Sequence, residues 1–466
     1  MQKYRIRMLV ILIAAAAVVP IWAYDPPAGA ETLGSLGSPT LMSGAFTAAS
    51  EEAPVGDLAN PASSALLQRT TLDLSYAALV GLGTETGWGN VLNLGLAIPK
   101  PYGVWTGYVG LVSSPFTSSM PLGTIVTGRI GMAKDLFPDL LVGASVKAQA
   151  GSNSGFGWGL GADLGVIGKA GDIGFLKSFV WGASLRNVGK AFTAPGAVGI
   201  EGTTPATGYE SPFTPQVGAA AELFRSDSGS LALSANADLW FPSFQNLVVS
   251  SGLELGWQDK AFLRLGWDFN FREAFAGADQ GLLPSIGIGA SFAVDKAGDD
   301  SFMSKAGFNR SEIRPSIAAK QLNGDVWAFG GGVNVPIGVI DKTPPVIAVT
   351  WPATSWDAYH FSPNNDGTLD DIVLPLTITD QRYVKSFDLK VFDAAGAVVR
   401  TIANKESRPE NQDLKDLVDR LLYVKKGVDV PSELVWNGLT DAGSAAPDGR
   451  YFIVVSATDD NGNTSS

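Results

Sequence analysis

Few side chains in this sequence could perform covalent chemistry. The 466 residues include no Cys and a single His, His360, which excludes a thiolate nucleophile, a disulfide and a pair of imidazole metal ligands. A Ser-His-Asp triad could form only around His360, and nothing beside that residue pairs with it for chemistry. The sequence therefore predicts a protein that is not an enzyme, with no catalytic residues and no cofactor.

One acidic loop offers oxygen ligands for a cation. Asn364, Asp366, Asp370 and Asp371 cluster carboxylate and amide oxygens, which are the ligands that Ca²⁺ prefers. The spacing of an EF-hand and its terminal Glu are missing, however, and Asn and Asp also build ordinary Asx turns. A turn is the favoured interpretation, with Asn364, Asp366 and Asp370 as a weak alternative metal site.

Other charged residues lie in segments that alternate apolar with small or polar residues. In 260–272, Leu263, Leu265 and Trp267 share one face, whereas Arg264 and Asp268 share the other. An Arg or Lys on the polar face could pair with a ligand carboxylate, or the charges could pair with one another. The candidate ligand-binding residues are Arg129, Lys147, Arg186, Arg264 and Asp268, and Asp163, Asp238 and Glu254 share their face.

The alternation recurs over residues 70–338 in segments of about ten residues, which is typical of membrane barrel strands. Strands are predicted near 70–80, 89–98, 102–112, 122–133, 139–150, 156–167, 174–187, 213–224, 229–240, 244–257, 260–271, 281–294 and 325–337, with a weaker one at 312–320. Single-chain bacterial barrels usually have an even number of strands, so we expect about fourteen. A soluble β-sandwich also alternates, but its outer face should carry many Lys and Glu residues.

Loop lengths predict the orientation of this barrel. Links after the even-numbered strands are mostly tight, and links after strands 1, 3, 7 and 11 are longer. Short turns belong on the periplasmic side, so both ends of the barrel should lie in the periplasm. The long link at 295–311 does not fit this pattern.

Composition divides the chain further. Residues 1–23 begin with Lys3, Arg5 and Arg7 and continue with a short apolar stretch, which predicts a signal peptide cut after Ala23 or as late as Ala30. Residues 341–466 carry 31 of the 78 charged residues but 7 of the 55 Gly, so a second domain begins near Asp341. The net charge of −12 argues against nucleic acid as a partner.

Residues 31–68 lack strand patterning and are rich in Gly and Ala. The residues Leu36-Gly37-Ser38, Gly44 to Ala48 and Asn60-Pro61-Ala62 resemble, in order and spacing, the start of the FadL-like outer-membrane transporter superfamily. That superfamily also includes the barrel shuttles of type IX secretion and spirochaetal paralogues. The resemblance implies a fourteen-stranded barrel in which Gly44, Ala45, Phe46, Thr47, Ala48, Asn60, Pro61 and Ala62 belong to an N-terminal plug. A long apolar capture hairpin and a terminal aromatic insertion signal are missing.

Residues 341–466 form a predicted small β-sandwich with strands at 345–350, 372–379, 386–393, 397–403 and 451–458. Phe361 to Gly367, Trp436-Asn437-Gly438 and Asp448 to Tyr451 resemble the immunoglobulin-like domain of the flagellar hook-capping protein. Residues 411–422 have helical spacing and form an insertion relative to that domain. The helix could cover a sheet edge of its own domain, which is the favoured interpretation, or dock a partner.

Two functions follow from these features. The leading hypothesis is an outer-membrane barrel, in contact with membrane lipid, that transports or binds hydrophobic small molecules such as long-chain fatty acids. Residues 341–466 would then be a periplasmic attachment module. The alternative is a scaffold that does not transport and anchors a secretion or envelope assembly, with a protein partner bound through 341–466.

Overall fold

The computed structural model describes residues 24–44, 47–50, 54–83, 85–116, 120–193, 196–200, 205–207, 213–295, 310–350, 360–405 and 414–466. The expected signal peptide, Ala45, Phe46 and most of the link at 295–311 lie outside these residues. The chain divides into two compact units, Met1–Val339 and Ile340–Ser466. Among the described residues, no helix is both long enough and apolar enough to cross a membrane.

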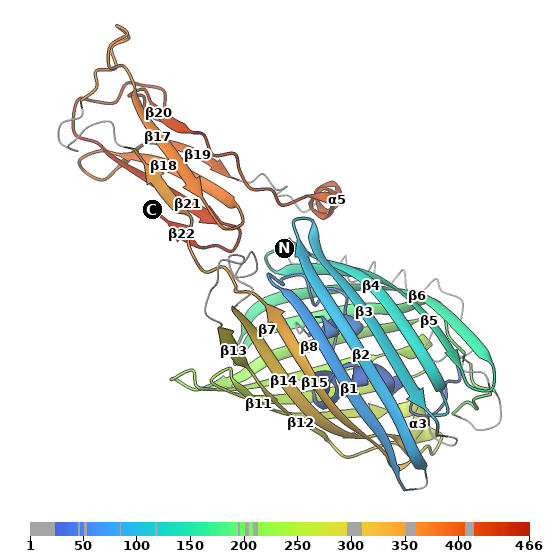
Figure 1. Ribbon diagram of the computed structural model, residues 1–466. Helices are drawn as coiled ribbons and strands as arrows, with labels where there is room; N and C mark the ends of the chain where they lie inside the picture. The colour runs from blue at the N-terminus through green and yellow to red at the C-terminus, as the bar shows by residue number, and fades with distance from the viewer. Residues whose placement is uncertain are drawn as a thin grey trace. The chain divides into compact units, whose positions relative to one another are not determined.

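The first unit is a closed antiparallel barrel (Figure 1). Neighbouring strands pair in sequence order, and the first strand pairs with the last from Thr70↔Ile337 to Gly81↔Val326. The strands are β1 (Thr70–Leu82), β2 (Thr86–Lys100), β3 (Gly103–Ser114), β4 (Gly123–Phe137), β5 (Leu140–Ser152), β6 (Phe156–Ile173), β7 (Leu176–Lys190), β8 (Thr214–Arg225), β9 (Leu231–Trp240), β10 (Val248–Trp257), β11 (Ala261–Asn270), β12 (Ser285–Ala290), β13 (Phe292–Asp295), β14 (Arg310–Gln321) and β15 (Val326–Ile337).

The prediction of fourteen strands is confirmed. Both β12 and β13 pair with β14, on either side of a break at Ser291, so together they fill one position in the wall. The weak strand expected at 312–320 is β14, which pairs with β15 over eight residues.

Side chains alternate across the wall because successive residues of a strand point to opposite faces. In β11, Leu263, Leu265 and Trp267 are exposed on the outside, whereas Arg264 and Gly266 are buried. The buried face lines the interior of the barrel and is called the lumen face below. The outer face has many exposed apolar residues, as the alternation predicted.

The two ends of the barrel differ in their connections. Short links join β2 to β3, β4 to β5, β6 to β7, β8 to β9 and β10 to β11 at one end, the turn end, where β1 also begins and β15 stops. The opposite end, the loop end, holds the long links 115–122, 191–213 and 271–284. The link between β1 and β2 was expected to be long and is short, because pairing continues to Leu82↔Thr86. Two short helices, η3 (Pro242–Phe244) and η4 (Asn323–Asp325), lie at the loop end, with α3 (Phe271–Phe275).

The N-terminal segment lies within the barrel. It contains three short helices, η1 (Ala30–Gly37), α2 (Pro39–Ser43) and η2 (Val55–Leu58), which Figure 1 shows in blue, enclosed by the strands. Pro39 begins α2 and Ser38 caps it by accepting a hydrogen bond from Leu41 N. Most described residues from Tyr24 to Ala65 are buried, so this segment fills the lumen as a plug.

The second unit contains two antiparallel sheets. One has the order β16 (Val346–Val349), β17 (Ile372–Thr379), β20 (Glu433–Trp436); the other has the order β19 (Val398–Lys405), β18 (Val384–Phe392), β21 (Phe452–Asp459), β22 (Thr464–Ser465). Leu374 and Leu376 of one sheet and Leu389 and Val391 of the other belong to a single apolar cluster. The five expected strands are present, and β20 and β22 were not predicted.

The helix expected within 411–422 is α5 (Leu414–Leu422). Val418, Leu421 and Leu422 are exposed, although a helix that covers its own domain should bury its apolar face. Trp436, the last residue of β20, is 2% exposed and packs edge-on against Tyr451, with ring centroids 5.1 Å apart.

Candidate functional site

An apolar cluster, called the chamber below although residues of the plug fill it, lies at the loop end of the lumen. Its wall consists of lumen-facing residues at the loop ends of the strands, and its filling consists of residues from the plug. The wall includes Leu79, Val91, Ile125 and Val326, with Phe116, Leu122, Phe192 and Leu322 from the adjoining links, and the filling is Ala30, Leu33, Leu36 and Met42. Burying Leu33 and Leu36 here contributes about 1.5–3 kcal/mol each to holding the plug in place.

Farther from the loop end than the chamber, two strands of the wall form a buried ion pair. One of its members also contacts the plug. Arg129 Nη2 of β4 lies 2.8 Å from Asp163 Oδ2 of β6, and Arg129 Nη1 donates to the Asp57 carbonyl of the plug over 2.6 Å. Asp163 also accepts hydrogen bonds from Ser145 Oγ and Asn187 N. Because both charged groups are almost fully buried, removing either one would leave the other as an uncompensated buried charge.

Lys147 and Arg186 belong to the same cluster as Arg129. All three basic side chains interact electrostatically with the Asp163 carboxylate. Glu31 of the plug interacts in the same way with Lys147 and Arg186. The other two predicted residues lie apart from this cluster on β11. There, Arg264 Nε pairs with Glu254 Oε2 at 2.6 Å, and Asp268 pairs with Lys320 of β14. The predicted charges therefore form two groups: Arg129 and Arg264 each pair with a carboxylate of the protein, and Asp268 pairs with Lys320.

The Asn60 side chain forms several hydrogen bonds within the plug and with the wall. Its Nδ2 donates to the carbonyl oxygens of Ala48 and Val166 at 2.7 and 3.0 Å. Its Oδ1 accepts from Ala62 N over 3.0 Å, and Asn60 is fully buried. Ala48 N donates in turn to Asp238 Oδ2 of β9 over 2.6 Å. Ala48 and Asn60 of the N-terminal segment thus contact residues of the barrel strands.

Glycines on the lumen face make room for the plug backbone. A Cβ built on Gly182 would lie 1.9 Å from the Ala48 carbonyl oxygen, and one on Gly143 would lie 2.1 Å from the Pro61 carbonyl oxygen. A Cβ on Gly266 would lie 2.3 Å from the Gly44 carbonyl oxygen. These approaches leave no space for a side chain, which explains why the lumen face of this chain is rich in Gly.

The wall is incompletely paired between β11 and β14 at the loop end. β12 separates these strands but pairs with β11 only as far as Gly266↔Ser285. Beyond that point the Asp268–Lys320 ion pair crosses the gap, and Lys320 Nζ also donates to Ser35 Oγ of the plug over 2.9 Å. A pocket of about 20 Å³ beside Thr32, Trp267 and Lys320 has room for one water molecule.

The beginning of the plug is fastened at the loop end. Glu273 of α3 accepts hydrogen bonds from Gly29 N at 3.0 Å and from Asn323 Nδ2 at 2.7 Å. Burial raises the pKa of the Glu273 carboxyl above its ordinary value, although these two hydrogen bonds act in the opposite direction. Asp25 forms an isolated bridge with Thr207, which lies in the long link 191–213.

The carboxylates of the acidic loop in the second unit accept hydrogen bonds from backbone N–H groups of the same loop. Asp370 Oδ1 accepts from Asn364 N and Asn365 N, and its Oδ2 accepts from Gly367 N. Asp366 Oδ1 accepts from Thr368 N at 2.8 Å. The contact of Asp366 with Thr368 is that of an Asx turn, whereas Asp370 accepts from residues that precede it in the loop. His360 beside the loop is exposed.

Sequence reasoning missed the apolar chamber. Its signal was present, because Leu79, Val91, Ile125 and Val326 are apolar residues on the parity that elsewhere has small or charged residues. Asp57, Ser35 and Glu273 were also missed. Their importance depends on contacts between the plug and distant strands, which spacing along one chain does not reveal.

Comparison with known proteins gives matches among solved structures. No protein-family model matches the chain, and no curated protein matches it. A deletion mutant of the monoaromatic hydrocarbon channel TodX is similar, with 10% identity, 65% of this chain and 99% of that chain covered, and a TM-score of 0.41. The Ralstonia pickettii toluene transporter TbuX is similar at 14% identity, with 66% of this chain and 98% of that chain covered and a TM-score of 0.39. A Pseudomonas aeruginosa FadL homologue is similar at 12% identity, with 67% of this chain and 98% of that chain covered and a TM-score of 0.34.

Proposed function

We propose that this chain is an outer-membrane β-barrel that binds and passes hydrophobic small molecules such as long-chain fatty acids. The outer face supports a membrane location. Leu94 of β2, Ile130 of β4 and Leu265 of β11 are exposed there, and an apolar surface that encircles a barrel needs lipid to cover it. Residues 341–466 would form a periplasmic, immunoglobulin-like attachment module.

The apolar chamber is the observation that carries the proposal. The lumen of a membrane barrel is usually polar, yet the wall residues Leu79, Val91 and Val326 are apolar. Leu33 and Leu36 of the plug fill the chamber in this structure. A hydrophobic molecule that enters from the loop end could take their place, because it would bury the same apolar wall.

The contacts of Lys320 suggest how such a molecule would leave. Lys320 contacts both Ser35 of the plug and Asp268 across the incompletely paired wall. Movement of the plug would remove one of these contacts and weaken the closure between β11 and β14. The molecule would then leave the chamber sideways at this gap or downward past the displaced plug.

Binding to an enlarged chamber tests the proposal. Leu36→Ala should leave an apolar cavity, and such cavities take up small apolar molecules. We expect the full-length variant in lipid nanodiscs to bind a fluorescent long-chain fatty acid several-fold more tightly than the unaltered protein. Toluene should compete for the same cavity. Leu94→Ala, on the outer face, is the matched control and should change nothing. Equal or absent saturable binding in all three proteins would refute a ligand chamber.

One observation favours the alternative function, a scaffold that does not transport. Val418, Leu421 and Leu422 form an exposed apolar group on α5, and such groups commonly bind other proteins. A scaffold would have a permanently closed lumen, so ligand uptake distinguishes the two functions.

A further inference from the structure

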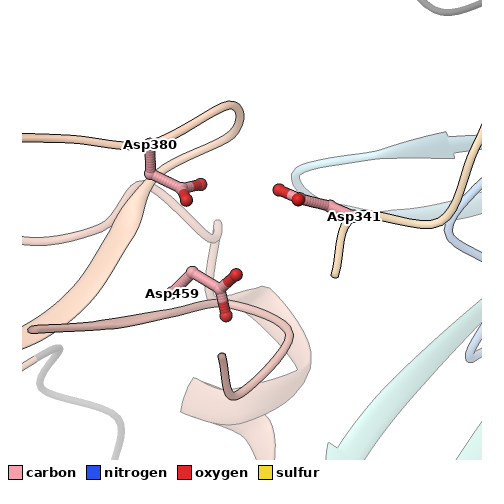
Figure 2. Close-up of side chains that lie close together, drawn as sticks. All are labelled: Asp341, Asp380 and Asp459. Atoms are coloured by element: carbon pink, nitrogen blue, oxygen red, sulfur yellow. The ribbon is translucent and has the colours of Figure 1, made fainter. Parts of the chain in front are cut away.

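Three aspartates from distant parts of the second unit converge on one point. Asp341 lies at the start of the unit, Asp380 directly follows β17, and Asp459 is the last residue of β21. One carboxylate oxygen from each lies within 4.8 Å of the other two. Figure 2 shows the three carboxylates pointing toward a common space from three separate chain segments.

One oxygen in this cluster is buried and has no hydrogen-bond partner in the described part of the chain. Asp341 is 9% exposed, and this oxygen is its Oδ2, whereas its Oδ1 accepts from Thr343 N and Thr343 Oγ1. A buried carboxylate oxygen without a donor is costly, since it has lost water and gained nothing in return. The oxygen belongs to a side chain that points at two further carboxylates, so the missing partner should be a positive charge.

No side chain among the residues that the structure describes supplies that charge. Within the described residues, none of the three aspartates forms an ion pair with a Lys or Arg. The guanidinium of Arg382 lies close by but pairs with the neighbouring Asp460 at 3.2 Å. Three carboxylates this close together repel one another strongly unless a cation lies between them.

The surrounding contacts hold the carboxylates in place. Asp459 is fully buried and accepts from Asn461 N, Asn463 N and Asn463 Nδ2. The side-chain amides of Asn461 and Asn463 also donate to the Asp341 carbonyl oxygen, at 3.3 and 3.2 Å. Two asparagines thus fix the distance between Asp341 and Asp459. Outer contacts of this kind orient the ligands of metal sites.

We propose that Asp341, Asp380 and Asp459 bind a Ca²⁺ ion. Calcium takes oxygen ligands at about 2.3–2.6 Å, so two of its ligands lie at most about 5 Å apart, which matches the observed spread. The ion tolerates irregular geometry and would complete its shell with water or carbonyl oxygens. Mg²⁺ fits less well because it requires a compact octahedron. The bound ion would fasten the first residues of the unit to the ends of β17 and β21.

Calorimetric titration of the full-length protein in detergent with CaCl₂ tests this site. We expect one ion with a Kd of about 10⁻⁴–10⁻³ M, the range of extracellular modules. Asp341→Asn and Asp380→Asn should each weaken binding at least about tenfold, since each removes a charged ligand but retains an oxygen. The control Asp448→Asn removes an exposed carboxylate of the same unit and should leave the Kd unchanged. Equal binding by all four proteins, or none at about 10 mM, ten times the upper limit of this range, would overturn the proposal.

Proteolysis provides a second readout that does not rely on heat changes. Lys342 is exposed and directly follows Asp341. Calcium should slow cleavage after Lys342 by a lysine-specific protease in the unaltered protein and in Asp448→Asn, but not in Asp341→Asn. Cleavage that calcium does not slow in the unaltered protein would contradict the site. The cleaved bond is identified by sequencing the new N-terminus.

Discussion

The side-chain oxygen of Asn60 occupies the place that a side chain at Gly165 would need. A Cβ built on Gly165 of β6 would lie 1.9 Å from Asn60 Oδ1. Asn60 also donates to the carbonyl of Val166, the next residue of that strand. The plug and the wall are therefore fitted to each other at this point, and the fit depends on glycine.

Replacing this glycine should loosen the plug. We expect Gly165→Ala to force Asn60 out of its position at a cost of about 1–3 kcal/mol, the usual cost of overpacking. The midpoint of urea unfolding in detergent would fall. Gly128→Ala in β4 is the matched control, because a Cβ there has nothing within 4 Å. Equal losses in the two variants would mean that Asn60 does not hold the plug.

Breaking the buried pair Arg129–Asp163 should lower the free energy of unfolding more than breaking an exposed pair does. Asp163→Asn leaves the Arg129 charge buried without its partner, so we expect a loss of about 3–5 kcal/mol in the free energy of unfolding. Adding Arg129→Met should recover part of this loss. Asp172→Asn, which breaks the exposed pair with Lys177, should have little effect. Strict additivity of the two lumen substitutions would contradict a coupled pair.

Fastening of the plug at the loop end should depend on pH through Glu273. Burial raises the pKa of this carboxyl, so the folded state keeps its proton to higher pH than the unfolded state does. The stabilising effect is complete below the ordinary pKa of glutamate and is lost as the pH rises through the raised pKa. We expect the melting temperature of the unaltered protein to fall relative to Glu273→Gln over this interval. A difference in melting temperature between the two proteins that stays the same at every pH would show that Glu273 does not titrate in this interval.

The mature N-terminus should be Tyr24. Tyr24 is buried and its hydroxyl donates to Glu31 Oε1 over 2.8 Å, and Asp25 pairs with Thr207. Residues 24–30 are thus built into the fold, which favours signal cleavage after Ala23 over cleavage after Ala30. N-terminal sequencing of the protein isolated from membranes decides between them. A chain that begins at Glu31 would show that these contacts are dispensable.

Much of the barrel could be predicted because alternation is a local property of each strand. Period-two patterning placed Arg129, Lys147, Arg186 and Arg264 on the lumen face, where all four are buried. The same patterning predicted β14, but with a weaker signal than for the other strands. One of its buried residues, Lys320, contacts the polar Ser35 of the plug.

The partners of these residues could not be predicted, for geometric reasons. Arg129 and Asp163 are on strands separated by β5, so their contact depends on the curvature of the closed wall. The position of Asn60 depends on how the plug folds within the lumen. Likewise, Asp341, Asp380 and Asp459 are scattered over 119 positions of the chain and meet only after two sheets have formed. Patterns within a short window of sequence contain none of this information.

Reversible locking of the plug tests most directly whether the barrel passes hydrophobic molecules. The chain contains no Cys, so Asn60→Cys combined with Gly165→Cys would introduce the only pair that can form a disulfide between plug and wall. Uptake of a fluorescent long-chain fatty acid would be followed in Gram-negative cells that lack their own fatty-acid channel, with Asn60→Cys alone as the control. We predict that oxidation reduces uptake to the level of cells without the protein and that reduction restores it. Uptake that is unaffected by oxidation, or never exceeds the background in any form, would contradict transport past a movable plug.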